Sequence, residues 1–480
     1  MLAYIENILQ EFRKCFSRTA SFKWFVISVI GMMLRSDHLG VTSIIRDLAL
    51  SPGCYESLLH FFRSSAYRMD ALRAQWYRVI LQRAPLEKCK GRFILVGDGV
   101  KQPKEARRMP CVKKMVQESE TVSKPEYIHG HLFGAIGVVA GTLAKHFCIP
   151  LKVNIQDGLK EAASWKESEG IDDISGMNHV EQIVASAFEA AKVMGNCYVL
   201  LDRYFLSKTA LKLAARLNAG REEALVEIIT KAKSNCTAYM EPLRRPPGSK
   251  GRPSLKGKKI HVADLFDQPQ RFTKARVSVY GGTEVVSYYC TDLLWGQGLY
   301  QKLRFVLVNY GDMQSILVST DLTLRPKRII ELYAKRSSIE SLFREMKQQV
   351  GAFCYHFWTG CLPRLNRFAR KGTGDVLSRV VKPADRRKVL HTVKAIHSFV
   401  FCATVAIGIA QVISLDDRLS TGIQTIRYLR TYSAGAPSEG SVMYYFRKRF
   451  FLFMAKSPES FITQYIREKQ PPVMDADEAA

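Results

Sequence analysis

Two short apolar segments, each with an aspartate at its end, constrain the fold of this chain more than any other feature. Residues 92–99 carry Asp98 and residues 197–202 end at Asp202. Both segments are too short for buried helices and are typical of strands buried on both faces. Helices are predicted at His179–Met194 and Ser207–Leu217, and further strands at Leu132–Val139, Leu151–Ile155 and Leu225–Lys231. This mixture of strands and helices predicts a mixed α/β core.

Helical regions are predicted on both sides of this core. Residues 1–90 and 361–470 show apolar residues at helical spacing and no strand-like alternation. Within the first region, Thr42–Leu48 and Tyr55–Arg63 are separated by a break at Ser51–Gly53, as in a helix-turn-helix. Such pairs are common in helical proteins, so this one is either a DNA-docking element or ordinary helix packing.

A β-rich insertion interrupts the α/β pattern. Glu241–Lys259 combines prolines, glycines and many cations, which predicts a basic loop, and Arg276–Tyr289 and Arg304–Val308 have the composition of strands. A strand at Ile316–Thr320 and a long helix at Pro326–Val350 return to the core. The expected regions are a helical N-terminal region (1–90), the first part of the core (91–240), the insertion (241–315), the helix that completes the core (316–360), a helical C-terminal region (361–470) and an acidic tail (471–480).

The charge balance indicates a polyanionic partner. Lys and Arg number 71 against 44 Asp and Glu, which gives a net charge of +27. Such an excess attracts nucleic acid or an anionic membrane surface, although a basic protein without a polyanionic partner has the same balance.

Neither a membrane span nor a disulfide framework is expected. The apolar runs Trp24–Leu34 and Phe399–Ile413 are shorter than the roughly 20 residues that a span needs, so both are interpreted as core helices. The 11 cysteines contain no Cys-x-x-Cys pair, and Cys354, His356 and Cys361 fit no common zinc spacing. We expect a soluble cytoplasmic protein with reduced thiols.

The predicted helix 326–350 carries a patterned stripe. At about 100° per residue, Tyr333, Arg336, Glu340 and Lys347 fall within an arc of about 60°, beside the apolar face. This stripe could be a solvated surface with ordinary ion pairs. Alternatively, Glu340 holds a metal ion while Arg336 and Lys347 bind the phosphates of a nucleic acid strand.

Three carboxylates become a candidate active site when they are taken together. Asp98 and Asp202 are expected at the ends of neighbouring strands, and Glu340 on a facing helix. Such a set can hold two divalent ions that activate water or a 3′-hydroxyl and stabilise the leaving oxygen. Oxygen ligands favour Mg²⁺, with Mn²⁺ as a substitute. Each acid alone is more often a strand cap or a surface charge.

The same residues carry a resemblance to a known family. Tyr333, Arg336, Glu340 and Lys347 match, without a gap or substitution, the YREK signature of DDE transposases from bacterial insertion sequences. The sequences around Asp98 and Asp202 resemble that group as well, and the likeness covers about residues 90–360. It implies an RNase H-like core with a β-rich insertion, catalysis by the three acids, and cut-and-paste transposition of double-stranded DNA. It further implies cleavage at inverted-repeat ends, a hairpin intermediate and strand transfer by a homodimer.

Three further residues are candidate DNA contacts. Arg344 lies beside the signature and Arg252 lies in the basic loop. Trp295 precedes two glycines inside the insertion. In the resembled family a tryptophan of the insertion stacks on a flipped base, whereas the commoner role of a tryptophan in a β-rich module is to fill its core.

Alternatives of other classes stay open. The chain could be an RNase H-fold nuclease that cuts without strand transfer, or a DNA-binding regulator derived from a transposase. A regulator has no need of three intact acids.

Overall fold

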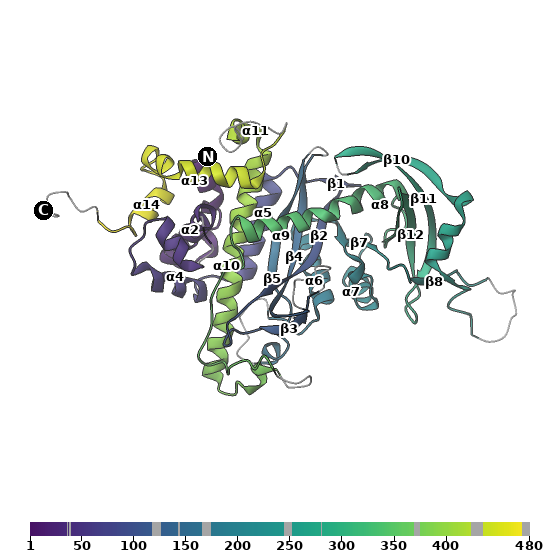
Figure 1. Ribbon diagram of the computed structural model, residues 1–480, viewed down its shortest axis with the longest axis horizontal. Helices are drawn as coiled ribbons and strands as arrows, with labels where there is room; N and C mark the ends of the chain where they lie inside the picture. Colours follow the sequence, from purple (N-terminus) through teal and green to yellow (C-terminus); the bar gives the residue numbers. More distant parts are fainter. Residues whose placement is uncertain are drawn as a thin grey trace.

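The computed structural model describes residues 1–35, 37, 40–117, 126–142, 145–165, 174–243, 252–279, 281–368, 375–423 and 435–472. The acidic tail beyond residue 472, and Arg244, Arg245 and Lys250 of the basic loop, lie outside these ranges. Figure 1 shows an elongated molecule with a helical body at one end, a sheet in the middle and the strands β10, β11 and β12 at the other end.

The helical body contains both ends of the chain. Phe22 and Phe461 pack with their ring centroids 6.0 Å apart, and Lys23 pairs with Glu468 at 2.7 Å. The helices of this body are α1 (Leu2–Gln10), α2 (Thr19–Leu34), α3 (Val41–Asp47), α4 (Cys54–Arg63), α5 (Met69–Arg83), α10 (Pro383–Leu415), α11 (Asp417–Ser420), α13 (Glu439–Lys456) and α14 (Phe461–Arg467). The N-terminal and C-terminal segments therefore share one apolar core.

Helix α10 is the central element of this body. By length and composition it could cross a membrane, and it is longer than the apolar run 399–413 suggested. However, 94% of its apolar window is buried inside the protein. A helix that is apolar all round and covered by other helices is a core helix. Helix α2 is likewise buried along most of its length, because α10, α13 and α14 pack around it.

A large mixed sheet fills the rest of the molecule. Its main path runs β3-β4-β2-β6-β7-β13-β12-β11-β8-β9, with β1 on β2, β5 on β4 and β10 on β11. The strands are β1 (Lys88–Cys89), β2 (Arg92–Pro103), β3 (Lys113–Val116), β4 (Tyr127–Gly141), β5 (His146–Ile155), β6 (Cys197–Leu201), β7 (Val226–Lys231), β8 (Thr237–Tyr239), β9 (Lys259–His261), β10 (Thr273–Val279), β11 (Gly282–Trp295), β12 (Gln301–Tyr310) and β13 (Met313–Ser319). Strands β2, β6 and β7 are parallel, and the other pairs are antiparallel. The RNase H-like mixed α/β fold expected from the sequence is confirmed.

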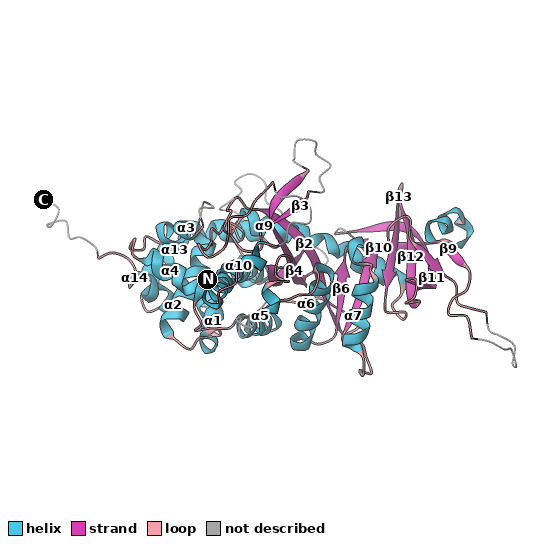
Figure 2. Ribbon diagram, turned by 90° about the horizontal axis from the view of Figure 1, so that it is seen from below, coloured by secondary structure: helices cyan, strands magenta, loops and turns pink. Residues whose placement is uncertain are grey.

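Helices cover the two faces of the central strands. Helices α6 (His179–Met194) and α7 (Lys208–Asn218) pack together on one face. Helix α9 (Ser338–Gln348) packs over β2 and β5 from the other side, and Figure 2 shows β2 and β4 between α9 and α6.

The strands of residues 241–315 extend the core sheet rather than forming a separate module. Strand β13 pairs with β7 on one side, in the register Leu317↔Lys231, and with β12 on the other. The segment 276–289, which the sequence suggested as one strand-like stretch, contains parts of two strands of the hairpin β10–β11. The ladder of hydrogen bonds is therefore continuous from the core into this region.

The predicted helix 326–350 is not continuous. It consists of α8 (Pro326–Tyr333), a 3-10 segment η7 (Ala334–Ser337) and α9. A 3-10 turn takes three residues rather than 3.6, so the constant 100° step of the sequence analysis was wrong here. Residues three apart, such as Tyr333 and Arg336, come close to eclipsing one another across this segment.

Candidate active site

The two aspartates lie at the same level on adjacent parallel strands. The last pair of the β2–β6 ladder joins Gly97 to Leu201, and Asp98 and Asp202 are the next residues on each strand. Neighbouring strands are about 4.8 Å apart, so the two backbones stay close at this point. The prediction that Asp98 ends its strand was wrong. Strand β2 continues to Pro103, because β4 goes on pairing with it after β6 has ended.

The glycines beside Asp98 serve helix packing. A Cβ atom at Gly97 would lie 2.8 Å from the Leu201 side chain, and one at Gly99 would lie 2.9 Å from the ring of His179. Both positions face α6, while Asp98 between them faces the opposite side of the sheet. The two glycines therefore leave room for α6 and do not open access to Asp98.

Arg336 joins two of the three acids on the α9 face of the sheet. Its Nη1 donates to Glu340 Oε1 at 2.5 Å, and its Nη2 donates to Asp98 Oδ2. The side chains of Arg336 and Asp98 are 16% and 21% exposed, whereas that of Glu340 is 62% exposed. The 3-10 segment and the first turn of α9 thus bring a guanidinium and a carboxylate to the middle of β2.

The charges of the cluster act on one another. Burial raises the pKa of the Asp98 carboxyl, the Arg336 charge opposes that shift, and the charges of Asp202 and Glu340 add to it. Burial works to lower the pKa of the Arg336 guanidinium, but the charges of Asp98, Asp202 and Glu340 raise it above its usual value. The charges of three carboxylates therefore act on one cation.

This donor set fits a hard divalent cation. All three acids offer carboxylate oxygens, which are the ligands that Mg²⁺ and Mn²⁺ prefer. Within the described ranges, no three His, Cys, Asp or Glu side chains converge closely enough to hold a metal ion. The position between Asp98 and Glu340 is taken by the guanidinium of Arg336, itself a cation.

The other residues of the signature lie near this cluster. The charge of Tyr333 contributes to the pKa of Arg336, which places its side chain nearby. Lys347 is exposed, seven residues after Glu340 and therefore on the same side of α9. Arg344 lies between them, is exposed, and pairs with Glu345 at 3.1 Å.

Trp295 and Arg252 are not part of the carboxylate cluster. Arg252 is exposed at the edge of the described part of the basic loop. Trp295 is half-buried at the end of β11, before a turn in which Gly296 and Gly298 have positive φ. A hydrogen bond from Trp295 opposes the burial that raises the pKa of the Cys236 thiol.

A cavity of about 430 Å³ lies between Trp295 and the segment that follows Asp202. Its lining includes Trp295 and Tyr239 together with Tyr204, which is 61% exposed. Lys208 lines it too and donates to the Gln297 carbonyl at 3.3 Å. The cavity therefore combines aromatic rings with cations.

Sequence reasoning missed His179 and Gln156, which lie behind Asp98. His179 Nδ1 lies 2.6 Å from Gln156 Oε1, and its ring packs against Gly99. Burial lowers the pKa of His179 to about 4, so the ring is neutral at pH 7. Asn178 caps α6 with a capping box and so fixes the position of His179. The capping signal was present in the sequence, but nothing local linked it to Asp98.

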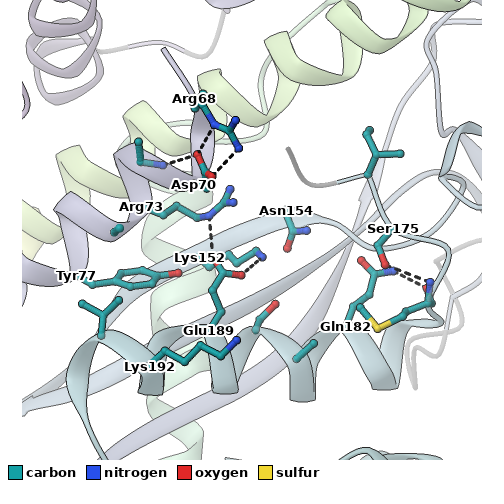
Figure 3. Close-up of a pocket in the computed structure, with 17 residues that line it drawn as sticks. Arg68, Asp70, Arg73, Tyr77, Lys152, Asn154, Ser175, Gln182, Glu189 and Lys192 are labelled. Carbon is teal, nitrogen blue, oxygen red and sulfur yellow. Dashed lines mark hydrogen bonds and ion pairs between the residues drawn. The ribbon is translucent and has the colours of Figure 1, made fainter. Parts of the chain in front are cut away.

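A second cluster of charges lies on the opposite face of the sheet, in a cavity of about 770 Å³ between α5, β5 and α6 (Figure 3). Arg73 Nε lies 3.1 Å from Glu189, and Lys152 Nζ lies 2.6 Å from the same carboxylate. Lys152 pairs across the sheet with Ile136, which pairs with Gly97, so it faces α6 like that glycine. This cluster ties three elements together and is separate from the acids.

One known family matches this chain. The family described as DDE superfamily endonuclease matches residues 11–286, more than half of the chain. The match includes Asp98 and Asp202 and ends before Glu340, whose place in the site comes from the geometry above. No curated protein matches the chain. Enzymes of this kind act on DNA and use divalent metals. This chain belongs to the DDE superfamily of endonucleases.

Proposed function

We propose that the chain is the transposase of a bacterial insertion sequence of the YREK group. In this proposal it cuts the DNA at the ends of the element and joins them to target DNA. One observation carries the proposal: Arg336 of the signature contacts both Asp98 and Glu340, and the charge of Asp202 acts on the same guanidinium. A surface helix stripe would not need a partner in the middle of a buried strand.

Asp98, Asp202 and Glu340 would hold two Mg²⁺ ions, for which Mn²⁺ can substitute. The bound ions would polarise the scissile phosphate and activate the attacking hydroxyl. The residues of this chain position the DNA and the acids. His179 packs behind Gly99 and keeps the Asp98 segment against α6.

Arg336 has two alternative partners in this proposal. Without DNA it neutralises part of the charge of Asp98 and Glu340. With DNA present, its fork of donors would bind a phosphate of the strand being cut, which is the geometry that guanidinium groups favour. Lys347 and Arg344 on the exposed side of α9 would extend this contact along the same strand, and Arg252 would contact a more distant phosphate.

Trp295 would act on the base beside the cleavage site. The aromatic lining of the cavity next to Asp202 supports this role, because every base can stack on such rings. Stacking is worth roughly 1–3 kcal/mol. Trp295→Ala should therefore slow hairpin formation and leave the first nick unchanged. Equal loss of both steps, or loss of folding by circular dichroism, would make Trp295 a structural residue.

The decisive experiment is a two-ended cleavage assay. The substrate is linear DNA that carries the sequences on both sides of the gene, incubated with the full chain and Mg²⁺. A transposase releases the segment between the ends and joins it to a supercoiled target. Cleavage without a joined product would identify a nuclease, and binding without cleavage would identify a regulator. Asp98→Asn is the matched negative control.

The proposal also covers how the protein assembles on DNA and where in the cell it acts. The helices α3 and α4 are candidates for docking on DNA, and the active complex is a homodimer on two DNA ends. We place its action in the bacterial cytoplasm, on the nucleoid. The domain boundaries given in the sequence analysis stay predictions.

A further inference from the structure

A basic cavity lies next to the active site, on the other side of the 3-10 segment η7. It has a volume of about 510 Å³ and lies between the β1–β2 turn, the start of α8 and the end of β10. Lys335 lines it, and the next residue is Arg336, which contacts the acids. One short turn therefore places one cation in each of two neighbouring sites.

Cations outnumber acids in the lining of this cavity. It contains two carboxylates and five cations, which are Glu87, Glu331, Lys88, Lys90, Arg325, Arg328 and Lys335. Both carboxylates are engaged. Glu331 is 6% exposed, pairs with Arg328 at 2.7 Å and accepts from the backbone of Ser278 at 3.2 Å. Glu87 pairs with the buried Lys335 at 2.9 Å.

Three of the cations have no carboxylate partner among the described residues, and the ammonium group of Lys88 lies 4.2 Å from the centroid of the Phe93 ring. Across the described part of the chain, no carboxylate lies within 4 Å of the charged groups of Lys88, Lys90 or Arg325. Lys90 donates to the carbonyl and hydroxyl of Thr323 at 3.1 and 2.9 Å, which fixes its direction. The nearby Asp321 accepts from the Tyr198 hydroxyl at 2.7 Å, and Lys90 acts on it only at longer range.

The lining also indicates which part of a nucleic acid would bind. No aromatic side chain lines this cavity, in contrast to the one beside Asp202. Lys88, Lys90, Arg325 and Arg328 are all exposed around it. Several exposed cations without stacking rings suit a sugar–phosphate backbone rather than a base.

We propose that this cavity binds the sugar–phosphate backbone of duplex DNA a few nucleotides from the bond that is cut. The assignment rests on the proposed function, because it takes DNA as the substrate. Lys335 fixes η7 through Glu87 while Arg336 reaches the acids, so a duplex held here is aligned with the active site.

A charge-matched pair of variants tests the proposal. The cavity variant is Lys88→Gln, Lys90→Gln and Arg325→Gln, and the control is Lys448→Gln, Arg449→Gln and Lys456→Gln on α13, three exposed cations in the helical body. Binding of a 40-bp duplex with a free end is measured in EDTA at several salt concentrations. Each lost phosphate contact removes about 0.9 from the log–log slope, so the cavity variant should lose about 2.7 and bind roughly tenfold or more weakly at low salt. The control should keep the wild-type slope. Equal slopes for the cavity variant and the wild type, or equal losses in both variants, would overturn the assignment.

Acetylation of lysines, followed by mass spectrometry of the full chain, gives an independent measurement. Duplex DNA should protect Lys88 and Lys90 and leave Lys448 reactive. A parallel sample contains millimolar inorganic phosphate in place of DNA. Equal protection of the two lysines by phosphate would instead show a site for a small anion. Binding is measured without metal and so does not depend on cleavage. A chain that binds duplex in this measurement but cuts nothing in the assay with Mg²⁺ would reject the proposed function and leave this result valid. A wild-type chain that binds no duplex would reject both.

Discussion

Two charge clusters on opposite faces of the same sheet contain the same types of side chain but have different roles. On the α9 face, the charges of Asp98, Asp202 and Glu340 act on the guanidinium of Arg336. On the α6 face, the carboxylate of Glu189 contacts both Arg73 and Lys152 (Figure 3). The first cluster has carboxylates in excess of cations. In the second, one carboxylate joins α5 to β5.

This difference in composition distinguishes a site for a cation from a structural ion pair. Both clusters are half-buried, and both contain short contacts, so neither burial nor distance separates them. The acidic composition of the first cluster distinguishes it, because carboxylates in excess repel one another until a cation enters. Variants of both clusters test this distinction.

The largest effect should follow removal of a carboxylate from the acid-rich cluster. Asp98→Asn, Asp202→Asn or Glu340→Gln should each reduce Mg²⁺-dependent strand cleavage by about a thousandfold or more, since metal clamping lowers the barrier by several kcal/mol. Folding, measured by circular dichroism, and binding of duplex in EDTA should persist. Cleavage by Glu340→Gln at the wild-type rate would remove Glu340 from the site.

The second cluster should respond in stability rather than in activity. Glu189→Ala removes a carboxylate that contacts both Arg73 and Lys152, whose side chains are 6% and 10% exposed. Breaking a fully buried pair costs about 3–5 kcal/mol, and the 37% exposure of Glu189 reduces our expectation to about 2–3 kcal/mol. Urea unfolding gives the free energy, and cleavage at low temperature is the control. A loss of cleavage in a stable variant would contradict the purely structural role.

Arg336 should compete with metal for the acids. Arg336→Gln should bind Mn²⁺ about tenfold more tightly in the absence of DNA, which calorimetry measures as about 1.4 kcal/mol. The gain should shrink when DNA is present, because DNA would draw the wild-type guanidinium away. Lys347→Gln is the matched control, since Lys347 is exposed two turns further along α9. Unchanged or weaker Mn²⁺ binding by Arg336→Gln would show that Arg336 does not block the metal.

The smallest effect concerns His179, which packs against Gly99 on the α6 face. Its pKa is lowered to about 4 by burial, so between pH 6.5 and 4 the unfolded chain takes up a proton that the folded chain does not. This residue therefore lowers stability as the pH falls, by under about 1 kcal/mol at pH 6. The stability of His179→Gln, measured by thermal unfolding, should fall less than that of wild type over this range. Parallel curves would mean that the ring is not buried neutral.

Much of the core was predictable because its signals are local. Helix α6 and strand β6 begin and end within one residue of their predicted bounds, since a capped amphipathic helix and a short apolar run are complete within a few residues. The prediction of one continuous helix over 326–350 was wrong at η7, because an internal 3-10 segment leaves the spacing of apolar residues on both sides almost unchanged. The prediction of the end of β2 was wrong for another reason. Which neighbour continues to pair with a strand depends on residues far away, here those of β4.

The fold class, the two apolar strands that carry Asp98 and Asp202, and the four-residue spacing that lets Arg336 reach Glu340 follow from the amino-acid sequence alone. They depend on the period of a strand or a helix and need no contact with a distant segment. The contacts between distant segments are what make Asp98 face α9 while its two glycines face α6, and what place Arg336 between Asp98 and Glu340. Only the tertiary structure brought Lys88, Lys90 and Arg325 together, from segments more than 200 residues apart. Strand pairing decides which face of the sheet a side chain lies on. The net charge of a site depends on which distant segments contribute residues to it.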